Sequence, residues 1–572
     1  MLKKAMLMYK WTIFIYILMG VTTQFLGTAG IRVFQKLLDH IAQATGLRDG
    51  FTLLFLYGAM LIGATLLHYL QEYPHTVLST GISEQLKVMA LGKVSGMDYA
   101  AYQNTGTGDL IKLIDNGAHA GKNILHSFFL RILHELLPGL LFSLFFISLY
   151  NPQLMLVIGI GYLAVFLLSQ LLLGRLYRIK SKLLANQEKM SALSVRGFME
   201  LAVFRLNRRY KKELELLQAT AGEIVRNSVR IRMIHEAFFA LFALLVIMIK
   251  LAVLVYGARS LLAGHSSIGT LAAMIMFVDQ IYSPIAIFNV LYVEYKLNAV
   301  AYRRFEETLN GPEDANLHVG KEVDLLRGKV DFQDVSFGYE GRGVLNHVTF
   351  SIEPGCSTAI IGASGSGKST IIKLMLGLLK KSSGHILVDG TDIDSLKLDS
   401  LYRHLSYISQ EAPVFDTCIR ENILFDEERP DEEIYRMLEQ VQLKEKVQAL
   451  PEGLETKIGE KGMKLSGGEK QRLAFARVLA QQRNLVILDE PVSALDNKTE
   501  KSLMDTILNQ LAGKTLVIVT HRLRSIRHVD TIILVRNGEI AGIGSFESLM
   551  AGSPYFRELW SLEEPASSSD AG

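Results

Sequence analysis

The chain of 572 residues carries 60 Lys and Arg against 57 Asp and Glu, and 49% of its residues are hydrophobic. These figures exclude a disordered chain and a polybasic nucleic-acid-binding surface, while two cysteines, Cys356 and Cys418, provide neither a disulfide framework nor a Cys/His zinc site. The mean hydropathy of +0.24 is high for a soluble enzyme and indicates that two unlike halves have been averaged.

The first 310 residues contain apolar runs long enough to cross a bilayer, which takes about 20 residues. Six runs are predicted to span the membrane: 11–30, 51–71, 132–150, 154–174, 237–257 and 270–291. A cleaved signal peptide is the alternative for the first run, but no small-residue cleavage site closes it and five more runs follow. We expect a polytopic α-helical membrane domain over residues 1–310, with six transmembrane helices and long cytoplasmic extensions.

Basic residues predict the orientation of this domain. Lys3, Lys4 and Lys10 precede the first run, and the connection 175–236 is rich in Arg and Lys, so both belong on the cytoplasmic side. The connections 72–131 and 175–236 are expected to continue as helices beyond the bilayer. We also expect a bacterial plasma membrane location and no peptidase domain ahead of the first run.

After residue 310 no such run recurs, and short β-branched segments alternate with helical patterns, which is typical of a parallel α/β sheet. We predict a linker over 311–327, an α/β P-loop NTPase domain over 328–560 and a polar, disordered tail over 561–572.

A phosphate-binding loop is predicted at "GASGSGKST", which fits G-x-x-x-x-G-K-[ST] between an apolar strand and a helical segment. Glycines let backbone N–H groups surround phosphates at a helix N-terminus, Lys368 would reach the β and γ phosphates, and Ser369 would ligate Mg²⁺. The residues expected to bind ATP here are Gly362, Ala363, Ser364, Gly365, Ser366, Gly367, Lys368, Ser369 and Thr370.

The apolar strand in "NLVILDE" ends in two carboxylates, Asp489 and Glu490. Buried parallel strands deliver such residues to the edge of the sheet where nucleotides bind. Asp489 is expected to hold Mg²⁺, and Glu490 to polarise or deprotonate the water that attacks the γ-phosphate.

In "LSGGEKQRLAFARVLA", the residues Ser466, Gly467 and Gly468 open an amphipathic helix and form a second backbone anion site. Together with the P-loop this stretch resembles the signature sequence of ATP-binding cassette (ABC) proteins. The resemblance extends over about 328–549. Glu469 stands where glutamine is common in the family, but it lies beyond the phosphate-facing residues.

The resemblance implies further roles. Tyr339 matches the aromatic residue that stacks on adenine, Gln410 matches the Q-loop, Asp496 closes the D-loop "SALD", and His521 matches the switch histidine. It implies ATP and Mg²⁺ as ligands, with Glu490, His521 and Gln410 catalytic and Ser369, Gln410 and Asp489 around the metal. In the family the signature of one domain closes over ATP held by the P-loop of another. Since this chain has one of each, it needs a second half-transporter, identical or related.

Six spans followed by one cassette resemble an exporter-type (type IV) ABC half-transporter of the bacterial multidrug, lipid and peptide exporters. "YQNTGTGDLIKLIDN" and "ELAVFRLNRRYKKELE" are similar to the two cytoplasmic turns that touch the cassette, and the run 270–291 is similar to the last span, including Pro284. The resemblance implies an ATP-driven exporter of an amphipathic small molecule, lipid or peptide that works by alternating access. Alternatives are an importer of a solute such as a metal chelate, a non-transport ABC ATPase, which six membrane runs argue against, and a gated channel.

Charged residues inside predicted spans are functional candidates by default. Lys250 and Asp279 could form a structural pair or line a substrate cavity, and the sequence leaves both open. Glu72, His134 and Glu135 fall at the inner ends of the second and third runs, where a wet vestibule or snorkelling could accommodate them.

Overall fold

The computed structural model describes most of the chain. The described residues are 1–43, 47–150, 155, 159–161, 167, 177–187, 189–191, 193–194, 201–339, 341–425, 427–459, 462, 464–492 and 497–563. The chain divides into two compact units, Met1–Ser95 with Thr105–Gly311, and Gly96–Asn104 with Pro312–Gly572.

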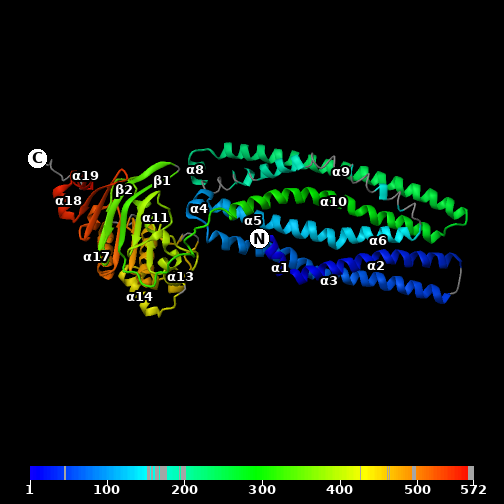
Figure 1. The fold of residues 1–572 in the computed structure, drawn as a ribbon, viewed down its shortest axis with the longest axis horizontal. Coiled ribbons are helices and arrows are strands. Elements are labelled where there is room, and N and C mark those ends of the chain that lie inside the picture. Colours follow the sequence, from blue (N-terminus) through cyan, green and yellow to red (C-terminus); the bar gives the residue numbers. More distant parts are fainter. Residues whose placement is uncertain are drawn as a thin grey trace. The chain divides into compact units, whose positions relative to one another are not determined.

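Long helices make up the first unit (Figure 1). Their bounds are α1 Leu2–Met8, α2 Lys10–Gln43, α3 Leu47–Val94, α5 Thr107–Lys122, η1 Asn123–Leu130, η2 Ile132–Leu136, α6 Leu137–Ser148, α8 Leu201–Leu206, α9 Tyr210–Leu262 and α10 Ile268–Leu309. α2 packs along α3, and α10 packs against α2, α5 and α9. Large apolar side chains such as Phe55, Ile62 and Met248 stay exposed on these helices, as expected for surfaces that face lipid.

Four helical stretches among the described residues are long and apolar enough to cross a membrane: Lys10–Gln43, Arg48–Val94, Thr107–Ser148 and Tyr210–Leu262. They contain the predicted runs 11–30, 51–71 and 237–257, and residues 132–148 of the predicted run 132–150. The predicted run 270–291 lies in α10, of which Ile268–Tyr282 is a shorter apolar stretch. The predicted run 154–174 falls almost entirely outside the described residues.

The third of these stretches changes its helical form between α5 and α6. Both η1 and η2 are π-helices, wider turns that are rare in proteins and frequent at functional sites. Pro138 stands in the first turn of α6. Because proline has no N–H and its ring collides with the carbonyl one turn earlier, it favours a disturbed turn just before it.

Two sheets organise the second unit. The six-stranded sheet has the order β10-β9-β3-β8-β7-β6, parallel except for β10, and the four-stranded antiparallel sheet has the order β2-β1-β4-β5. The strand bounds are β1 Val330–Tyr339, β2 Arg342–Ile352, β3 Ser357–Ile361, β4 Ser383–Val388, β5 Thr391–Asp392, β6 Leu405–Ile408, β7 Leu485–Asp489, β8 Thr515–Val519, β9 Thr531–Arg536 and β10 Glu539–Gly544. Strands β7 and β8 are buried at every residue, which explains their continuous apolar sequence.

Helices cover both sheets of this unit (Figure 1). The described α-helices are α4 Tyr99–Thr105, which begins in the Gly96–Asn104 segment, α11 Lys368–Met375, α12 Leu398–Tyr402, α13 Ile419–Leu424, α14 Asp431–Gln440, α15 Lys444–Gln448, α16 Gly467–Gln481, α17 Asn497–Gln510, α18 Phe546–Gly552 and α19 Pro554–Glu563. Short 3-10 turns are η3 Ile393–Ser395, η4 Gly453–Glu455 and η6 Leu523–Ile526.

The segment predicted as a linker, 311–327, packs into the second unit. Leu326 is 1% exposed within the core, and Leu317 and Val323 pack against the same core. At the other end, α19 runs to Glu563, so the predicted tail begins with three helical residues and its remainder falls outside the described residues.

Candidate nucleotide-binding site

The order of the parallel strands brings the predicted motifs to one edge of the sheet. β8 lies between β3 and β7, and all three run in the same direction. The P-loop follows β3, Asp489 ends β7 with Glu490 next in sequence, and His521 lies two residues after β8. The carboxyl ends of such strands are the usual place for a nucleotide in an α/β sheet.

The P-loop needs its glycines for conformation and for space. Gly365 and Gly367 have φ values of +78° and +107°, which favour glycine. A Cβ atom on Gly367 would come within 2.6 Å of Leu345 Cδ2, and one on Gly362 within 2.2 Å of the backbone oxygen of Val535. The loop is therefore wound tightly against β2 and β9, so that its N–H groups can face a phosphate.

Lys368 lies at the junction of this loop with α11. Its Nζ atom donates to the backbone oxygens of Gly362 and Ala363, both at 2.9 Å, and the residue is 7% exposed. Burial lowers the pKa of Lys368, and the negative charges of Glu490 and Asp489 oppose that shift. A desolvated ammonium beside the loop is the charge that an incoming triphosphate requires.

Asp489 ends the buried strand β7 and is itself 7% exposed. Burial raises its pKa to about 6, the adjacent Glu490 adds to the rise, and Lys368 and Lys373 oppose it. Within the described part of the chain this carboxylate makes no ion pair, so a bound cation would stabilise its charged form. Together with the hydroxyl of Ser369 at the start of α11, it offers the hard oxygen ligands that suit Mg²⁺.

Glu490 is the point at which the three predicted catalytic residues meet. Gln410 Nε2 donates to its Oε2 atom at 3.0 Å, and His521 Nδ1 lies 3.2 Å from its Oε1 atom. Its backbone has a φ of +47°, and its N–H donates to Val519 O at 2.8 Å. Neighbouring segments thus fix the direction of this carboxylate, as a general base requires. The side-chain amide of Gln410 thus points toward Glu490.

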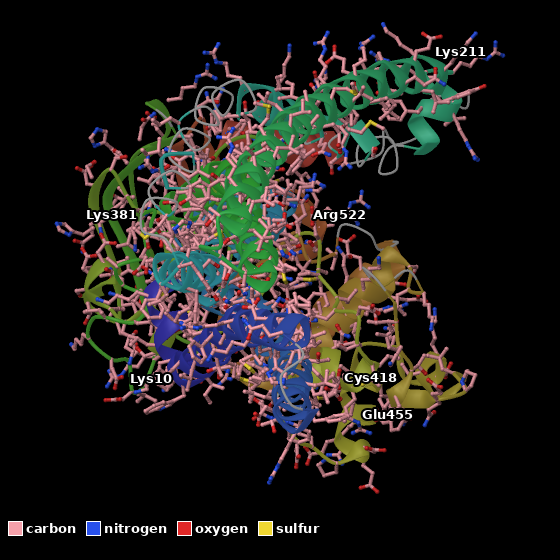
Figure 2. The ribbon with its side chains drawn as sticks, turned by 90° about the vertical axis from the view of Figure 1, so that its right-hand side faces the viewer. Lys10, Lys211, Lys381, Cys418, Glu455 and Arg522 are labelled. Atoms are coloured by element: carbon pink, nitrogen blue, oxygen red, sulfur yellow. The ribbon has the colours of Figure 1, made fainter. Side chains whose placement is uncertain are left out.

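An ion pair holds the loop that carries His521. The next residue, Arg522, is labelled in Figure 2. It pairs with the carboxylate of Glu500, whose side chain is 8% exposed. The N–H of Arg522 also donates to Thr520 Oγ1 at 2.9 Å. These contacts restrict the histidine loop without using the imidazole itself.

The signature segment opens α16 with a capping box. Ser466 is the N-cap and its Oγ accepts from Glu469 N at 3.4 Å, while Ser466 N donates to Glu469 Oε2 at 2.8 Å. Lys446 Nζ lies 2.5 Å from the other oxygen of Glu469. The glutamate that departs from the family pattern therefore stabilises the start of this helix, and Gly467 and Gly468 form its first turn.

The other residues predicted to bind ATP are Tyr339, the hydroxyl residues of the P-loop and Asp496. Tyr339 ends β1, is 41% exposed and lies edge-on to Phe337 with ring centroids 4.9 Å apart, so a face is available for stacking. Ser364 and Ser369 are exposed on the P-loop, whereas Ser366 and Thr370 are buried. Asp496, with the rest of the predicted D-loop, lies outside the described residues.

Sequence reasoning missed two contacts of this site. Tyr555 of α19 accepts a hydrogen bond from Ala363 N at 3.4 Å, and the Arg536 guanidinium lies 4.7 Å from its ring centre. Tyr99 of α4 lies 5.8 Å from the Nζ atom of Lys373 on the P-loop helix. Neither tyrosine stands in a recognisable motif, and Ala363 and Tyr555 are separated by 192 positions, so no local signal could have found them.

In the helical first unit the two charged candidates, Lys250 and Asp279, lie next to each other. Lys250 Nζ lies 2.5 Å from Asp279 Oδ1. Asp279 also lines a cavity of about 500 Å³. Other residues of its wall are Gln24, Gly27, Gly30, Tyr57, Glu135 and Gln280. The geometry therefore gives Asp279 a partner and a place in a cavity at once.

Sequence comparison identifies the family. The model described as ABC transporter matches residues 345–493, and the one described as ABC transporter transmembrane region matches residues 13–285. The chain belongs to the ABC transporter family. Its predicted fold class is confirmed: a helical membrane domain precedes an α/β nucleotide-binding domain, as in an exporter-type half-transporter.

Similar proteins include transporters of different names. "Iron-sulfur clusters transporter ATM1, mitochondrial" of Kluyveromyces lactis is 37% identical over 331 residues, 55% of this chain and 44% of that protein, so this ABC chain matches less than half of its relative's length. The Chaetomium globosum protein of the same name is 28% identical over 532 residues, 90% of this chain and 86% of the relative. "Putative multidrug export ATP-binding/permease protein YgaD" of Bacillus subtilis is 27% identical over 97% of both chains.

A solved structure, "Structure of a bacterial Atm1-family ABC exporter with ATP bound", matches 98% of this ABC chain and 100% of its own, with a TM-score of 0.87 and 21% identity. That likeness shows the fold. Residues 345–493 match the ABC transporter model, so the chain carries the ATP-binding domain of that family. Its matched membrane region makes it a multi-pass membrane protein.

Proposed function

We propose that this ABC chain is an ATP-driven exporter of an amphipathic small molecule, lipid or peptide, and that it works in the bacterial plasma membrane as a dimer of half-transporters. The observation that carries the proposal is the carboxylate of Glu490, held between Gln410 and His521 beside a buried Asp489 and Lys368. This combination equips the cassette for hydrolysis as well as for nucleotide binding.

Each residue of the site has a distinct task. The P-loop N–H groups and Lys368 bind the phosphates, and Tyr339 stacks on the base. Asp489 and Ser369 would hold Mg²⁺, which supplies charge neutralisation at the phosphates when bound. Glu490 accepts a proton from the attacking water, while Gln410 and His521 hold its carboxylate in place. The exclusion of bulk water requires a second cassette.

The need for a dimer follows from the two nucleotide-binding motifs that the cassette carries. The cassette has one P-loop and one signature, Ser466 to Gly468, and family architecture pairs each with the complement from another copy. The N-terminus of α16 would then present its N–H groups to the γ-phosphate of the opposite site. The partner is a second copy or a related half-transporter, and Asp496 is expected at the same interface.

Coupling to the membrane domain has a physical basis in the second unit. The segment Gly96–Asn104 groups with the cassette: Asp98 N donates to Pro312 O at 3.0 Å and Asp314 N donates to Gly96 O at 2.9 Å. Tyr99 in this segment lies against Lys373, a charge that acts on Asp489. A shift of this segment would therefore be felt at the predicted metal ligand.

The substrate class rests on the relatives and the cavity. Relatives are named for iron-sulfur clusters and for multidrug export. The cavity that Asp279 lines contains two carboxylates, two glutamines and several glycines, together with apolar side chains. A site that mixes polar groups with apolar surface suits an amphipathic compound.

Direction and catalysis can be tested together in liposomes. The purified chain is reconstituted, and ATP is supplied only outside, so that only transporters with outward cassettes turn over. Export predicts that candidate amphipathic compounds accumulate inside the vesicles. Loss of preloaded compound from the vesicles would instead establish the importer alternative.

Glu490→Gln provides the matched test of the catalytic assignment. We expect it to lower ATP hydrolysis by about 100-fold or more, because general-base catalysis contributes 10²–10⁴-fold, and to retain ATP binding. Glu432→Gln, an exposed carboxylate in the first turn of α14, is the control and should hydrolyse at the parent rate. A Glu490→Gln variant with the parent rate would overturn the general-base role.

A further inference from the structure

Three imidazoles surround one tyrosine inside the first unit, away from the nucleotide site. Tyr16 of α2 stacks on His134 of η2 with ring centroids 4.1 Å apart and an interplanar angle of 10°. His126 of η1 stacks on the same tyrosine at 5.8 Å, and His75 of α3 lies 6.1 Å away. His75 and His126 contact each other at 4.7 Å. We refer to these four residues as the histidine cluster.

Two nitrogens of the histidine cluster are buried with no partner. The Nε2 atoms of His126 and His134 are both inaccessible and make no hydrogen bond with the described residues. His126 is 7% exposed and Tyr16 6%. A buried polar atom left unsatisfied is costly, and each native example calls for a reason, such as a proton, an ion or a functional role.

The packing around His134 is close. A Cβ atom on Gly20 would approach His134 Cδ2 to 2.2 Å and the His134 carbonyl oxygen to 2.5 Å. Glycine at this position of α2 lets the helix backbone pass directly over the imidazole. The cluster therefore joins α2 to the π-helical turns, and any change in the imidazoles acts on that contact.

The charged and titratable groups that face the cluster from outside it lie on α3, at the end of α5 and in the segment around η2. They are His68 and Glu72 on α3, Lys122 at the end of α5, and Arg131 and Glu135 next to and within η2. Both carboxylates are engaged: Glu135 Oε2 accepts from Arg131 Nε at 3.0 Å, and Glu72 Oε2 lies 3.7 Å from His75 Nδ1. Protonated imidazoles would thus face Lys122, Arg131 and one another, with little uncommitted negative charge nearby.

We propose that the histidine cluster is a proton-binding site that makes the membrane domain responsive to pH. With neutral imidazoles the rings stack on Tyr16 and α2 stays packed against η1 and η2. Uptake of protons by His126 and His134 places like charges in a small buried space, separates the rings, and loosens α2 from the π-helical turns. Among the described residues no group of three or more His, Cys, Asp or Glu is arranged to hold a metal ion, so the proton is the ligand assigned.

Loosening this contact weakens the coupling of the membrane domain to the cassettes, and acid therefore lowers ATPase activity beyond the cassette's own pH response. The effect on ATPase activity rests on the proposed function, whereas the effect of protons on the stability of the cluster does not. A stability measurement and an activity measurement therefore test the two effects separately.

The first readout is the thermal unfolding midpoint of the full chain in lipid nanodiscs at about pH 7.5 and 4.5. The lower pH lies well below the ordinary histidine pKa of about 6.5, because burial disfavours a charged imidazole. The parent midpoint should fall on acidification, and His126→Asn or His134→Asn should reduce that fall by about 2–4 °C, because asparagine takes up no proton. His119→Asn is the matched control, since His119 is exposed on α5 and outside the cluster. An undiminished fall in both cluster variants overturns the proposal.

The second readout is the ATPase rate of each variant divided by the parent rate at the same pH, which cancels the response of the shared cassette. The ratio for His126→Asn should rise by about twofold or more from pH 7.5 to 4.5, and the His119→Asn ratio should stay constant. A constant ratio for the cluster variant overturns the effect on activity, even with an altered unfolding midpoint. If His126→Asn does not fold, His134→Asn takes its place, because its imidazole is the other proposed proton acceptor.

Discussion

His521 Nδ1 lies 3.2 Å from Glu490 Oε1, across two neighbouring parallel strands. On the other side of the same carboxylate, Gln410 Nε2 donates to Oε2. The general base therefore has one contact on each oxygen. Removal of either contact leaves the carboxylate chemically intact and free to rotate.

We expect His521→Ala to lower the maximal ATPase rate by up to about 100-fold, the loss that misplacement of a catalytic group produces, with less than a few-fold change in ATP affinity. Steady-state hydrolysis and direct nucleotide binding measure the two quantities separately. His528→Ala is the control, since His528 is exposed on the following loop. An effect confined to ATP affinity would show that His521 binds nucleotide and does not position Glu490.

The central part of the site was predictable because its determinants are local. A G-x-x-x-x-G-K-[ST] motif between an apolar strand and a helix indicates a phosphate-binding loop. A buried parallel strand that ends in Asp489 presents that residue at the carboxyl edge of the sheet. The adjacency of β3, β8 and β7 then brings Lys368, Asp489 and His521 together. Family resemblance supplied the roles of Gln410 and Tyr339, which no local pattern could assign.

Contacts made by tertiary packing were not predictable. Tyr16, His75, His126 and His134 come from separate helices. In the sequence, Tyr16 and His134 lie in two different apolar runs, and His75 and His126 lie in the connection 72–131. Their meeting depends on the helix register and on the π-helical turns before Pro138. The prediction of His134 at a wet vestibule or interface missed this stacking, because single-sequence periodicity assumes regular α-helices.

The carboxylate of Glu469 should make the stability of the first turn of α16 depend on pH. Burial alone would raise the pKa of Glu469, but hydrogen bonds from Lys446 and Ser466 outweigh it and hold the pKa below its usual range. The folded helix thus binds fewer protons than the unfolded chain. The stabilisation is present above the ordinary glutamate pKa of about 4.3 and is lost as pH falls through the lower, folded value.

We expect Glu469→Gln to lower the hydrogen-exchange protection of the first amides of α16 at pH 7. As pH falls from about 4.3 through the lower, folded pKa of Glu469, the parent should lose protection there and the variant should change less, because glutamine has no proton to gain. Protection factors, which correct for intrinsic exchange, are the quantity to compare. Equal pH dependence in both proteins would show that the capping box does not control this helix end.

Tyr555 should tune nucleotide affinity through the P-loop. Its hydroxyl accepts from Ala363 N at 3.4 Å, an exposed hydrogen bond that water can partly replace. We expect Tyr555→Phe to raise the ATP concentration for half-maximal hydrolysis by about 2- to 10-fold, equivalent to the 0.5–1.5 kcal/mol of one hydrogen bond, with the maximal rate unchanged. The ring stays in place for Arg536, and Tyr435→Phe serves as the control. A fall in maximal rate at unchanged affinity would contradict this role.

The Lys250 and Asp279 pair can be resolved by a double-mutant cycle. In a membrane interior, an unpaired charge costs about 2.5–3.5 kcal/mol by insertion measurements, so Lys250→Met alone should destabilise the membrane domain. Asp279→Asn should destabilise it for the same reason, because Lys250 then lacks its partner. If the pair is structural, the double variant recovers most of the parent stability, since neither charge remains. Thermal unfolding in nanodiscs supplies the four stabilities.

The same four proteins decide whether Asp279 also touches substrate. Asp279 lines the cavity beside Gln24 and Gln280, whereas Lys250 is not part of its wall. A role in substrate binding therefore predicts that both variants lacking Asp279 lose ATPase stimulation by transported compounds, and that the double variant does not recover it when its stability recovers. Recovery of stimulation together with stability would assign the pair a structural role alone. A loss of stimulation confined to Lys250→Met would contradict both assignments.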